Sequence, residues 1–253
     1  MLPNSDPAQY GNQKGISAQH YLVRMIHQIL TATDNNSKKE AMAVIVQMID
    51  WDSAFDRQCH RQGILSFIQN GVRKTLIPIL ISYFQERQMA VKWNGHMSKP
   101  YPLPGGGAQG GELGQLEYLS QSNDNVNFLS MEEKFKFIDD LSVLEILNLV
   151  NCGLTAYNFR KHVASDISSH GQYLPSENIK SETYLEEINK WTEDKQMLLN
   201  KMKTKYMVIN FTNKYKFNTR ISLEGVLLEE LQECRLLGVE IIISSHGTKT
   251  QKA

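Results

Sequence analysis

The sequence predicts an α+β fold, in which amphipathic helices and short apolar strands are both present. Two observations predict it. Some segments repeat apolar residues at the three-to-four-residue spacing of a helix, whereas others are short, rich in Val, Ile or Phe, and apolar nearly throughout. At 253 residues, the chain is long enough for one large domain, or two small ones, with a real core.

The first half of the chain is predicted to begin with a helix and a buried strand. Residues 16–34 place apolar side chains at helical spacing, and Ser17 can cap the first turn. Residues 41–50 are almost entirely apolar and rich in Val and Ile, which is typical of a strand buried on both faces. Two further helices are expected at 60–72 and 73–87.

Turn signals mark the middle of the chain. Asn94-Gly95 lies between two alternating segments and is the strongest short-range signal for a β-hairpin. The glycine-rich run at 104–111 cannot form regular structure, so we expect it to be a loop that opens onto a helix at 112–122.

The last hundred residues are predicted to add one helix and three strands. Residues 151–180 are polar and irregular, and the helix follows at 181–199, with Ser181 and Glu182 suited to its N-terminus. The strands are expected at 203–211, 216–223 and 234–243.

The composition is that of an ordinary globular protein. Apolar residues make up 41% and charged residues 21%, and the zero net charge gives no whole-chain support for a nucleic-acid partner. The three cysteines form no CxxC pair, which favours a reducing compartment over a disulfide framework or a zinc ribbon. Without an apolar signal core or a long apolar run, we expect an intracellular protein with no membrane partner. The sequence distinguishes neither nucleus from cytoplasm nor one oligomeric state from another.

Charge is unevenly distributed along the chain. Between residues 57 and 99, the basic residues are accompanied by a single acidic residue, Glu86. A solvated surface of mixed charge explains this alone, but beside a metal site the segment becomes a candidate track for a phosphate backbone. The basic residues are Arg57, Arg61, Arg73, Lys74, Arg87, Lys92 and Lys99.

Two predicted strands end in aspartate. Asp50 closes the strand at 41–50, and a strand at 134–138 leads into Asp139 and Asp140. If these strands are neighbours, the carboxylates repel one another and raise each other's pKa unless cations neutralise them. Oxygen ligands of this kind suit Mg²⁺, and two such ions can support phosphoryl transfer. Taken singly, each aspartate is more commonly a turn residue or a helix cap.

The order of the motifs adds a family resemblance. The segments IDWDSAFD, LPGGGAQGGELG, FKFIDD, NKMKTKYMVINF and LLGVEI follow one another, preceded by QYGNQKGISAQHYLVRMIHQIL. Together, over residues 7–242, they resemble the palm and part of the fingers of reverse transcriptases, most of all those of non-LTR, LINE-type retrotransposons. The resemblance implies a polymerase palm with an antiparallel sheet backed by helices, partial fingers and no thumb.

The same resemblance divides the chain 1–253. It implies fingers-like segments at 1–40 and 57–109, palm-like segments at 41–56 and 110–242, and a disordered tail at 243–253. On this view the chain begins inside the fingers and ends just after the primer-grip strand, so we expect the basic strands that usually hold the triphosphate to be absent.

The resemblance also implies a metal and nucleotide site. Asp50 and Asp139 match the metal-binding aspartates, Asp140 is their acidic neighbour, and the carbonyl of Trp51 is expected to face a metal. Phe55 falls at the steric gate, where a bulky ring under the sugar rejects a ribose 2′-OH; the alternative is a core aromatic. Ile138 departs from the family, which commonly has alanine or valine there.

Further roles follow from the remaining motifs. Gln109 and Gly110 match the loop that contacts the incoming nucleotide and the template, although Ala108 stands where proline is common. Lys203 matches the lysine that protonates the pyrophosphate leaving group, and an exposed lysine at a strand start is the alternative. Leu237 and Gly238 match the primer grip.

The implied reaction is template-directed DNA synthesis. The 3′-OH of a primer on an RNA or DNA template attacks the α-phosphate of a dNTP between two Mg²⁺ (or Mn²⁺) ions and releases pyrophosphate. The alternative is a catalytically inactive retroelement remnant, or a fragment that only binds nucleic acid.

Overall fold

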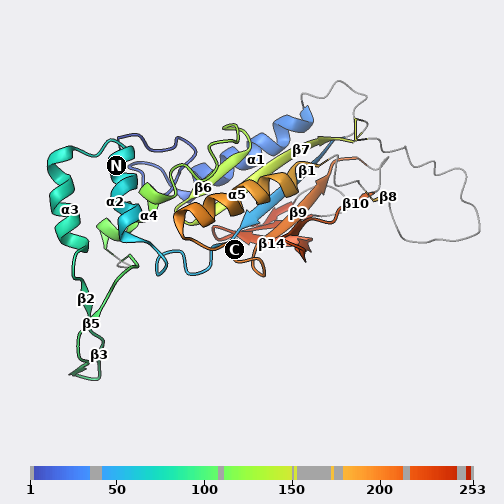
Figure 1. Cartoon of the computed structure of the whole chain (residues 1–253). Coiled ribbons are helices and arrows are strands. Elements are labelled where there is room, and N and C mark those ends of the chain that lie inside the picture. Colours follow the sequence, from blue (N-terminus) through green and yellow to red (C-terminus); the bar gives the residue numbers. More distant parts are fainter. Residues whose placement is uncertain are drawn as a thin grey trace, which may run out of the picture.

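A computed structural model of the chain has a five-stranded sheet at its centre, with strands in the order β13-β9-β1-β7-β6 (Figure 1). The predicted combination of helices and sheet is confirmed. The five strands are β1 (Met42–Ile49), β6 (Lys134–Phe137), β7 (Asp140–Asn148), β9 (Lys205–Asn210) and β13 (Glu229–Leu231). The structure describes residues 3–34, 42–107, 111–149, 151–152, 172–173, 179–212, 217–243 and 249–251.

The sheet is antiparallel except at one edge. β1 pairs antiparallel with β7 and β9, and β6 pairs antiparallel with β7, whereas β13 runs parallel to β9. The expected antiparallel sheet is found in β9, β1, β7 and β6, and β13 departs from it. That strand reaches β9 from the short hairpin of β11 (Ser222–Leu223) and β12 (Val226–Leu227).

Both faces of the sheet are covered, and the side chains of β1 alternate between them. Ala43, Ile45 and Ile49 pack in a core with α5 (Ser181–Lys195), while Val44 and Val46 pack in a second core with α1 (Ala18–Asp34). β1 is thus buried on both sides, as its apolar sequence predicts. The helix predicted at 181–199 ends at Lys195, because Gln196 adopts a left-handed conformation (φ 59°) and caps it.

A smaller helical unit lies beyond one end of the sheet (Figure 1). α2 (His60–Gln69) and α3 (Ile77–Phe84) share an apolar core with α4 (Glu112–Gln121), and a 3₁₀ turn (Lys74–Leu76) precedes α3. A narrow β-ribbon projects beyond α3 (Figure 1). It consists of β2 (Gln88–Met89) paired with β5 (Tyr101–Pro102) and β3 (Lys92–Trp93) paired with β4 (His96–Met97).

The tip of this ribbon confirms the predicted hairpin. Asn94 and Gly95 connect β3 and β4 with φ values of 47° and 82°, the positive pair that a type I′ turn requires.

Two of the predicted strands are wrong in detail. The strand expected at 216–223 is not continuous over the described residues 217–223, because Phe217–Asn218 (β10, paired with β8, Gln172–Tyr173) and Ser222–Leu223 (β11) belong to different sheets. Residues 234–243 form a hairpin instead of one strand: β14 (Glu233–Leu236) turns into β15 (Val239–Ile242), which also pairs with β16 (Lys249–Gln251). None of the helices in the described ranges has the length and apolar character needed to cross a bilayer.

Candidate active site

The pairing of β1 with β7 brings the predicted carboxylates together. Ile49 at the end of β1 lies opposite Leu141, so Asp50 leaves the sheet beside the tight turn that joins β6 to β7. Asp139 lies in that turn and Asp140 is the first residue of β7. The indole Nε1 of Trp51 donates a hydrogen bond to the carbonyl oxygen of Asp139 at 2.8 Å and ties the two strand ends together.

These strand ends open into a cavity of about 560 Å³, a size typical of sites for small ligands. Its walls come from the end of β1 and the loop after it, the β6–β7 turn, α4 and the loop before β9. Among its described lining residues, Lys203 is the single cationic side chain. The lining residues are Asp50, Trp51, Ser53, Ala54, Phe55, Asp56, Gln115, Ile138, Asp139, Asp140 and Lys203.

The site gathers negative charge. Burial raises the pKa of Asp50, as do the charges of Asp139 and Asp52, while Lys203 lowers it. Partial burial and the charges of Asp139 and Asp50 raise the pKa of Asp140 to about 6. The Oδ2 atom of Asp50 is buried and has no hydrogen-bond partner among the described residues. Mutual repulsion together with an unpartnered carboxylate oxygen is the situation that a bound cation relieves.

The carboxylates that line the cavity are oxygen donors, the kind of ligand that hard divalent cations take. In the described part of the chain, no group of three or more His, Cys, Asp or Glu side chains is arranged to bind a metal ion. Mg²⁺ commonly uses one or two carboxylates and completes its octahedral shell with water and substrate phosphates. Asp50 and Asp139 can supply such a pair, because both line the same cavity.

Phe55 is both a wall of the cavity and part of the core. Its ring stacks on that of buried Tyr118, with centroids 5.1 Å apart and planes inclined by 29°. The side chain is half-buried, and one surface of it lines the cavity. The two interpretations left open by the sequence, a gate and a core aromatic, are therefore compatible in this geometry.

The glycine-rich loop is anchored on the segment that contains Phe55. The N–H of Gly107 donates to the carbonyl of Phe55 at 2.8 Å, and the N–H of Gly106 donates to the carbonyl of Gln58 at 2.8 Å. A Cβ on Gly107 would lie 2.2 Å from Oε1 of Gln58, so glycine permits this approach. The predicted contacts Gln109 and Gly110 lie outside the described residues.

The predicted primer-grip residues lie elsewhere. Leu237 and Gly238 form the turn between β14 and β15, with φ values of 47° and 84°, and neither lines the cavity. Leu237 instead packs, partly buried, against the core shared by α1 and the sheet. The structure thus groups Asp50, Asp139 and Asp140 with Trp51, Phe55 and Lys203 and places this turn apart from them.

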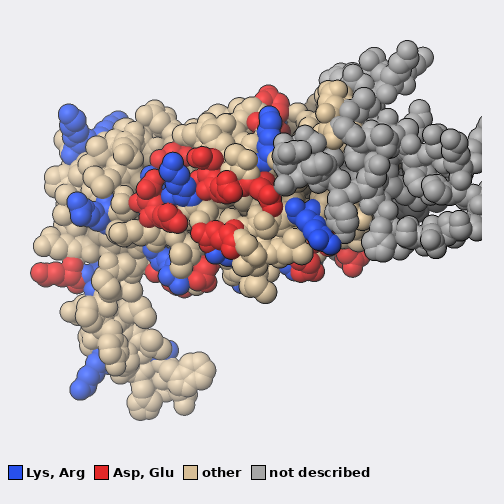
Figure 2. All heavy atoms as spheres, turned by 45° about the vertical axis from the view of Figure 1, so that its right-hand side comes forward, with Lys and Arg blue, Asp and Glu red and all other residues tan. Residues whose placement is uncertain are grey.

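Charged side chains outside the cavity are unevenly distributed. Figure 2 shows acidic side chains gathered over the middle of one face, the part formed by α5, whose sequence contains five acidic residues. Of the seven basic residues predicted as a phosphate track, Arg57 forms an exposed ion pair with Asp52 at 3.0 Å. The others lie on α2, around the 3₁₀ turn, and on the projecting ribbon.

The structure adds two residues near the cavity that the sequence motifs do not predict. Gln115 lines it from α4, and Gln9, far away in the sequence, bonds to the β6–β7 turn. Both side chains are neutral, so neither is marked in the sequence as a charged candidate. The distinctive glutamine-rich segment around Gln9, which resembles a fingers motif, was the one available signal.

The sequence is similar to polymerases of mobile elements from Drosophila melanogaster. No protein-family model matches the chain. It is 29% identical over 139 residues to a probable RNA-directed DNA polymerase from transposon X-element, an alignment that covers 53% of this chain and 15% of that protein. It is 25% identical over 239 residues to the probable RNA-directed DNA polymerase from transposon BS (92% and 23% covered). It is 23% identical over 250 residues to the RNA-directed DNA polymerase from mobile element jockey (95% and 24% covered). The chain therefore spans no more than 24% of the length of these relatives.

The fold is similar to that of solved telomerase structures. Apo telomerase from Candida tropicalis superposes with a TM-score of 0.52 at 12% identity, over 97% of this chain and 38% of that one. The form truncated from its C-terminal domain gives a TM-score of 0.51 at 12% identity, over 96% and 41%. At this identity the likeness shows a polymerase-like fold. The sequence relatives and this fold confirm the resemblance that the motifs indicated.

Proposed function

We propose, from this confirmed similarity to the RNA-directed DNA polymerases of mobile elements, that the chain is the palm-centred part of a reverse transcriptase. Its reaction is nucleotidyl transfer from a dNTP to the 3′-OH of a primer on an RNA or DNA template. The observation that supports this most is the convergence of Asp50 and Asp139 on one cavity, at the paired ends of strands that carry the matching motifs.

Asp50 and Asp139 are the proposed metal ligands, with Asp140 beside them. Bound Mg²⁺ or Mn²⁺ supplies charge neutralisation at the phosphates and favours ionisation of the primer hydroxyl. The carboxylates position that charge, since Asp50 follows β1 and Asp139 precedes β7 where these two strands are paired. The hydrogen bond from Trp51 to the carbonyl of Asp139 fixes the turn relative to Asp50.

The remaining cavity residues have proposed roles toward the nucleotide. Phe55 closes the space under the sugar, because its ring is held by the stack on Tyr118 and cannot easily swing away. Lys203 lines the cavity and donates a proton to the leaving pyrophosphate. Gln109 and Gly110 follow Gly107, whose N–H bonds to the carbonyl of Phe55, and they are proposed to contact the nucleotide and template.

We also propose which elements form the palm and which form the fingers. The central sheet with α4 and α5 is the palm, and α2, α3 and the projecting ribbon belong to the fingers. The exposed basic residues on these fingers-like elements, such as Arg61, Arg73 and Lys92, are proposed to contact the template backbone. The turn at Leu237 and Gly238 is proposed as the primer grip.

Primer extension on an RNA template tests the function. The 253-residue chain is supplied with a DNA primer, dNTPs and Mg²⁺, and compared with Asp139→Asn and with the control Asp52→Asn. Asp52 is also an aspartate after β1, but it pairs with Arg57 and does not line the cavity. We expect Asp139→Asn to lower extension by at least about 10²-fold, and the control to stay within about threefold. An inactive wild-type chain that still binds nucleic acid would favour a non-catalytic binding fragment.

A further inference from the structure

The N-terminal segment, residues 3–17, pairs at Gln9 with β6, the edge strand that ends in the β6–β7 turn. The N–H of Tyr10 donates to the carbonyl of Lys136 at 2.8 Å, and the N–H of Lys136 donates to the carbonyl of Ala8 at 3.1 Å. This pairing covers an edge that would otherwise expose unpaired backbone groups. It also brings the segment to the turn that contains Asp139.

That turn has an unfavourable backbone conformation. Ile138 has φ 57°, whereas Asp139 is not among the residues with positive φ. A positive φ at the first of two turn residues is the pattern of a type II′ turn, in which glycine is preferred at that position. A β-branched side chain in the left-handed region is a genuine outlier that persists only where surrounding contacts hold it.

The side-chain amide of Gln9 supplies those contacts. Its Oε1 accepts hydrogen bonds from the N–H of Ile138 at 2.9 Å and from the N–H of Gly11 at 2.8 Å, and its Nε2 donates to the carbonyl of Ile138 at 3.5 Å. Gln9 is itself 7% exposed. A Cβ on Gly11 would lie 2.5 Å from the nitrogen of Ile138, so only glycine permits such close passage.

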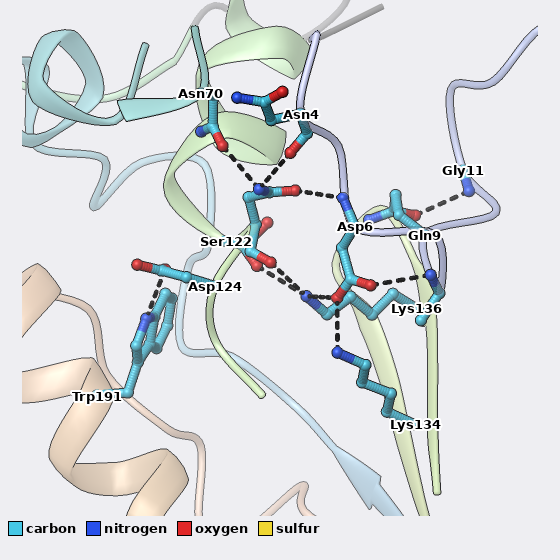
Figure 3. Close-up of polar contacts among 12 residues, drawn as sticks. Asn4, Asp6, Gln9, Gly11, Asn70, Ser122, Asp124, Lys134, Lys136 and Trp191 are labelled. Carbon is cyan, nitrogen blue, oxygen red and sulfur yellow. Dashed lines mark hydrogen bonds and ion pairs between the residues drawn. The ribbon is translucent and has the colours of Figure 1, made fainter. Parts of the chain in front are cut away.

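A buried ion pair fixes the base of the same segment. The carboxylate of Asp6 contacts Nζ of Lys136 at 2.8 Å and Nζ of Lys134 at 3.2 Å, and all three side chains are at most 8% exposed. Lys136 also donates to the carbonyls of Ser122 and Asn123 at 3.1 and 3.0 Å. Figure 3 shows Asp6 and Gln9 on this one segment, with Asp6 joined by dashed lines to both lysines and Gln9 joined to Gly11. Gln9 is thus attached to a fixed support.

We propose that Gln9 is a positioning residue for the reaction: its amide holds Ile138 in the left-handed conformation and so sets the direction in which Asp139 enters the cavity. This inference rests on the proposed function. The turn is held from two sides, by Gln9 at Ile138 and by Trp51 at the carbonyl of Asp139. Because Asp139 directly follows Ile138, a rotation about φ of Ile138 moves the carboxylate of Asp139 relative to that of Asp50.

The hydrogen bonds between the side chain of Gln9 and the backbone of Ile138 are called the clamp below. The substitution Gln9→Met tests this clamp, with Gln13→Met as the matched control. Methionine keeps the length and volume of glutamine but forms no bond to Ile138. Gln13 lies on the same segment, and its Nε2 donates to the backbone carbonyl of Gln9 and not to the turn. Amide hydrogen exchange at Ile138 reports the clamp itself, and single-nucleotide incorporation gives kcat and KM separately.

We expect Gln9→Met to speed exchange at Ile138 about tenfold and to lower kcat by about tenfold, with KM for dNTP and primer within about twofold. Gln13→Met should leave both exchange and kcat close to wild type. Unchanged exchange at Ile138 overturns the clamp. Faster exchange with unchanged kcat overturns the positioning role, and so does an equal loss of thermal stability and activity in both variants.

Failure of the proposed function is separable from failure of the clamp. If the wild-type chain does not extend a primer, the function fails, and Mn²⁺ affinity then replaces kcat as the second readout. The positioning role survives only if Gln9→Met both speeds exchange at Ile138 and weakens Mn²⁺ binding relative to Gln13→Met.

Discussion

Glu117 should make the chain less stable as the pH rises. This carboxyl lies on the inner side of α4, is 0% exposed, and its Oε2 has no hydrogen-bond partner among the described residues. Its Oε1 accepts a long hydrogen bond of 3.4 Å from Nε2 of Gln121. Burial raises the pKa of Glu117 to about 8, although the charge of Arg87 lowers it.

The size of the effect follows from proton linkage. The folded chain holds this proton up to about pH 8, whereas the unfolded chain releases it near 4.5. The folded state therefore binds more protons between these values, so the free energy of unfolding is highest below pH 4.5 and falls as the pH rises toward 8. Each pKa unit corresponds to about 1.4 kcal/mol, so the loss reaches about 3 kcal/mol by pH 7.

Urea unfolding of wild type and Glu117→Gln at pH 5 and pH 7.5 measures this difference. Glutamine keeps the shape and cannot ionise, so we expect the variant to stay within about 1 kcal/mol of wild type at pH 5 and to exceed it by about 3–4 kcal/mol at pH 7.5. Glu112→Gln, at an exposed position of the same helix, is the control and should change little at either pH. A Glu117→Gln difference that is constant over pH, or that the control reproduces, would refute the reasoning.

Two further substitutions test the cavity wall and the core. Phe55→Ala should raise the incorporation of ribonucleotides relative to deoxynucleotides by about tenfold or more, because the ring stacked on Tyr118 fills the space under the sugar; competing rNTP and dNTP incorporation measures this, and an unchanged ratio contradicts the gate. Tyr21→Phe should lower the free energy of unfolding by about 1 kcal/mol, because the buried phenol donates to Oγ of Ser142 at 2.7 Å. Equal stability of wild type and Tyr21→Phe in urea would show that this bond has no net effect.

Local patterns predicted the parts of the fold that local chemistry determines. The apolar run of β1 indicated a strand buried on both faces, and Asn94-Gly95 indicated its hairpin. Leu237-Gly238 makes the same kind of turn with a weaker signal, since leucine rarely adopts positive φ, and the hairpin of β14 and β15 was therefore missed. The composition of residues 216–223 predicts one strand, because it says nothing of which sheet each end joins.

In the candidate site, too, residues with a local sequence signal could be predicted and residues placed only by the tertiary fold could not. Asp50 and Asp139 could be paired in advance because each ends an apolar strand and the motifs occur in a known order. Gln9 could not be placed beside Ile138, since 129 residues separate them and neither residue is charged. Contacts of this kind depend on the tertiary fold, and a single sequence contains no local pattern for them.

Mn²⁺ binding, measured by titration calorimetry on the 253-residue chain, tests most directly whether Asp50 and Asp139 form one divalent-cation site. The charge cluster and the unpartnered oxygen of Asp50 predict that wild type binds Mn²⁺, and that Asp50→Asn and Asp139→Asn each weaken binding by at least about tenfold. Asp52→Asn, outside the cavity lining, should change the Kd by less than about threefold. Equal Mn²⁺ affinity in all four proteins would contradict the proposed site.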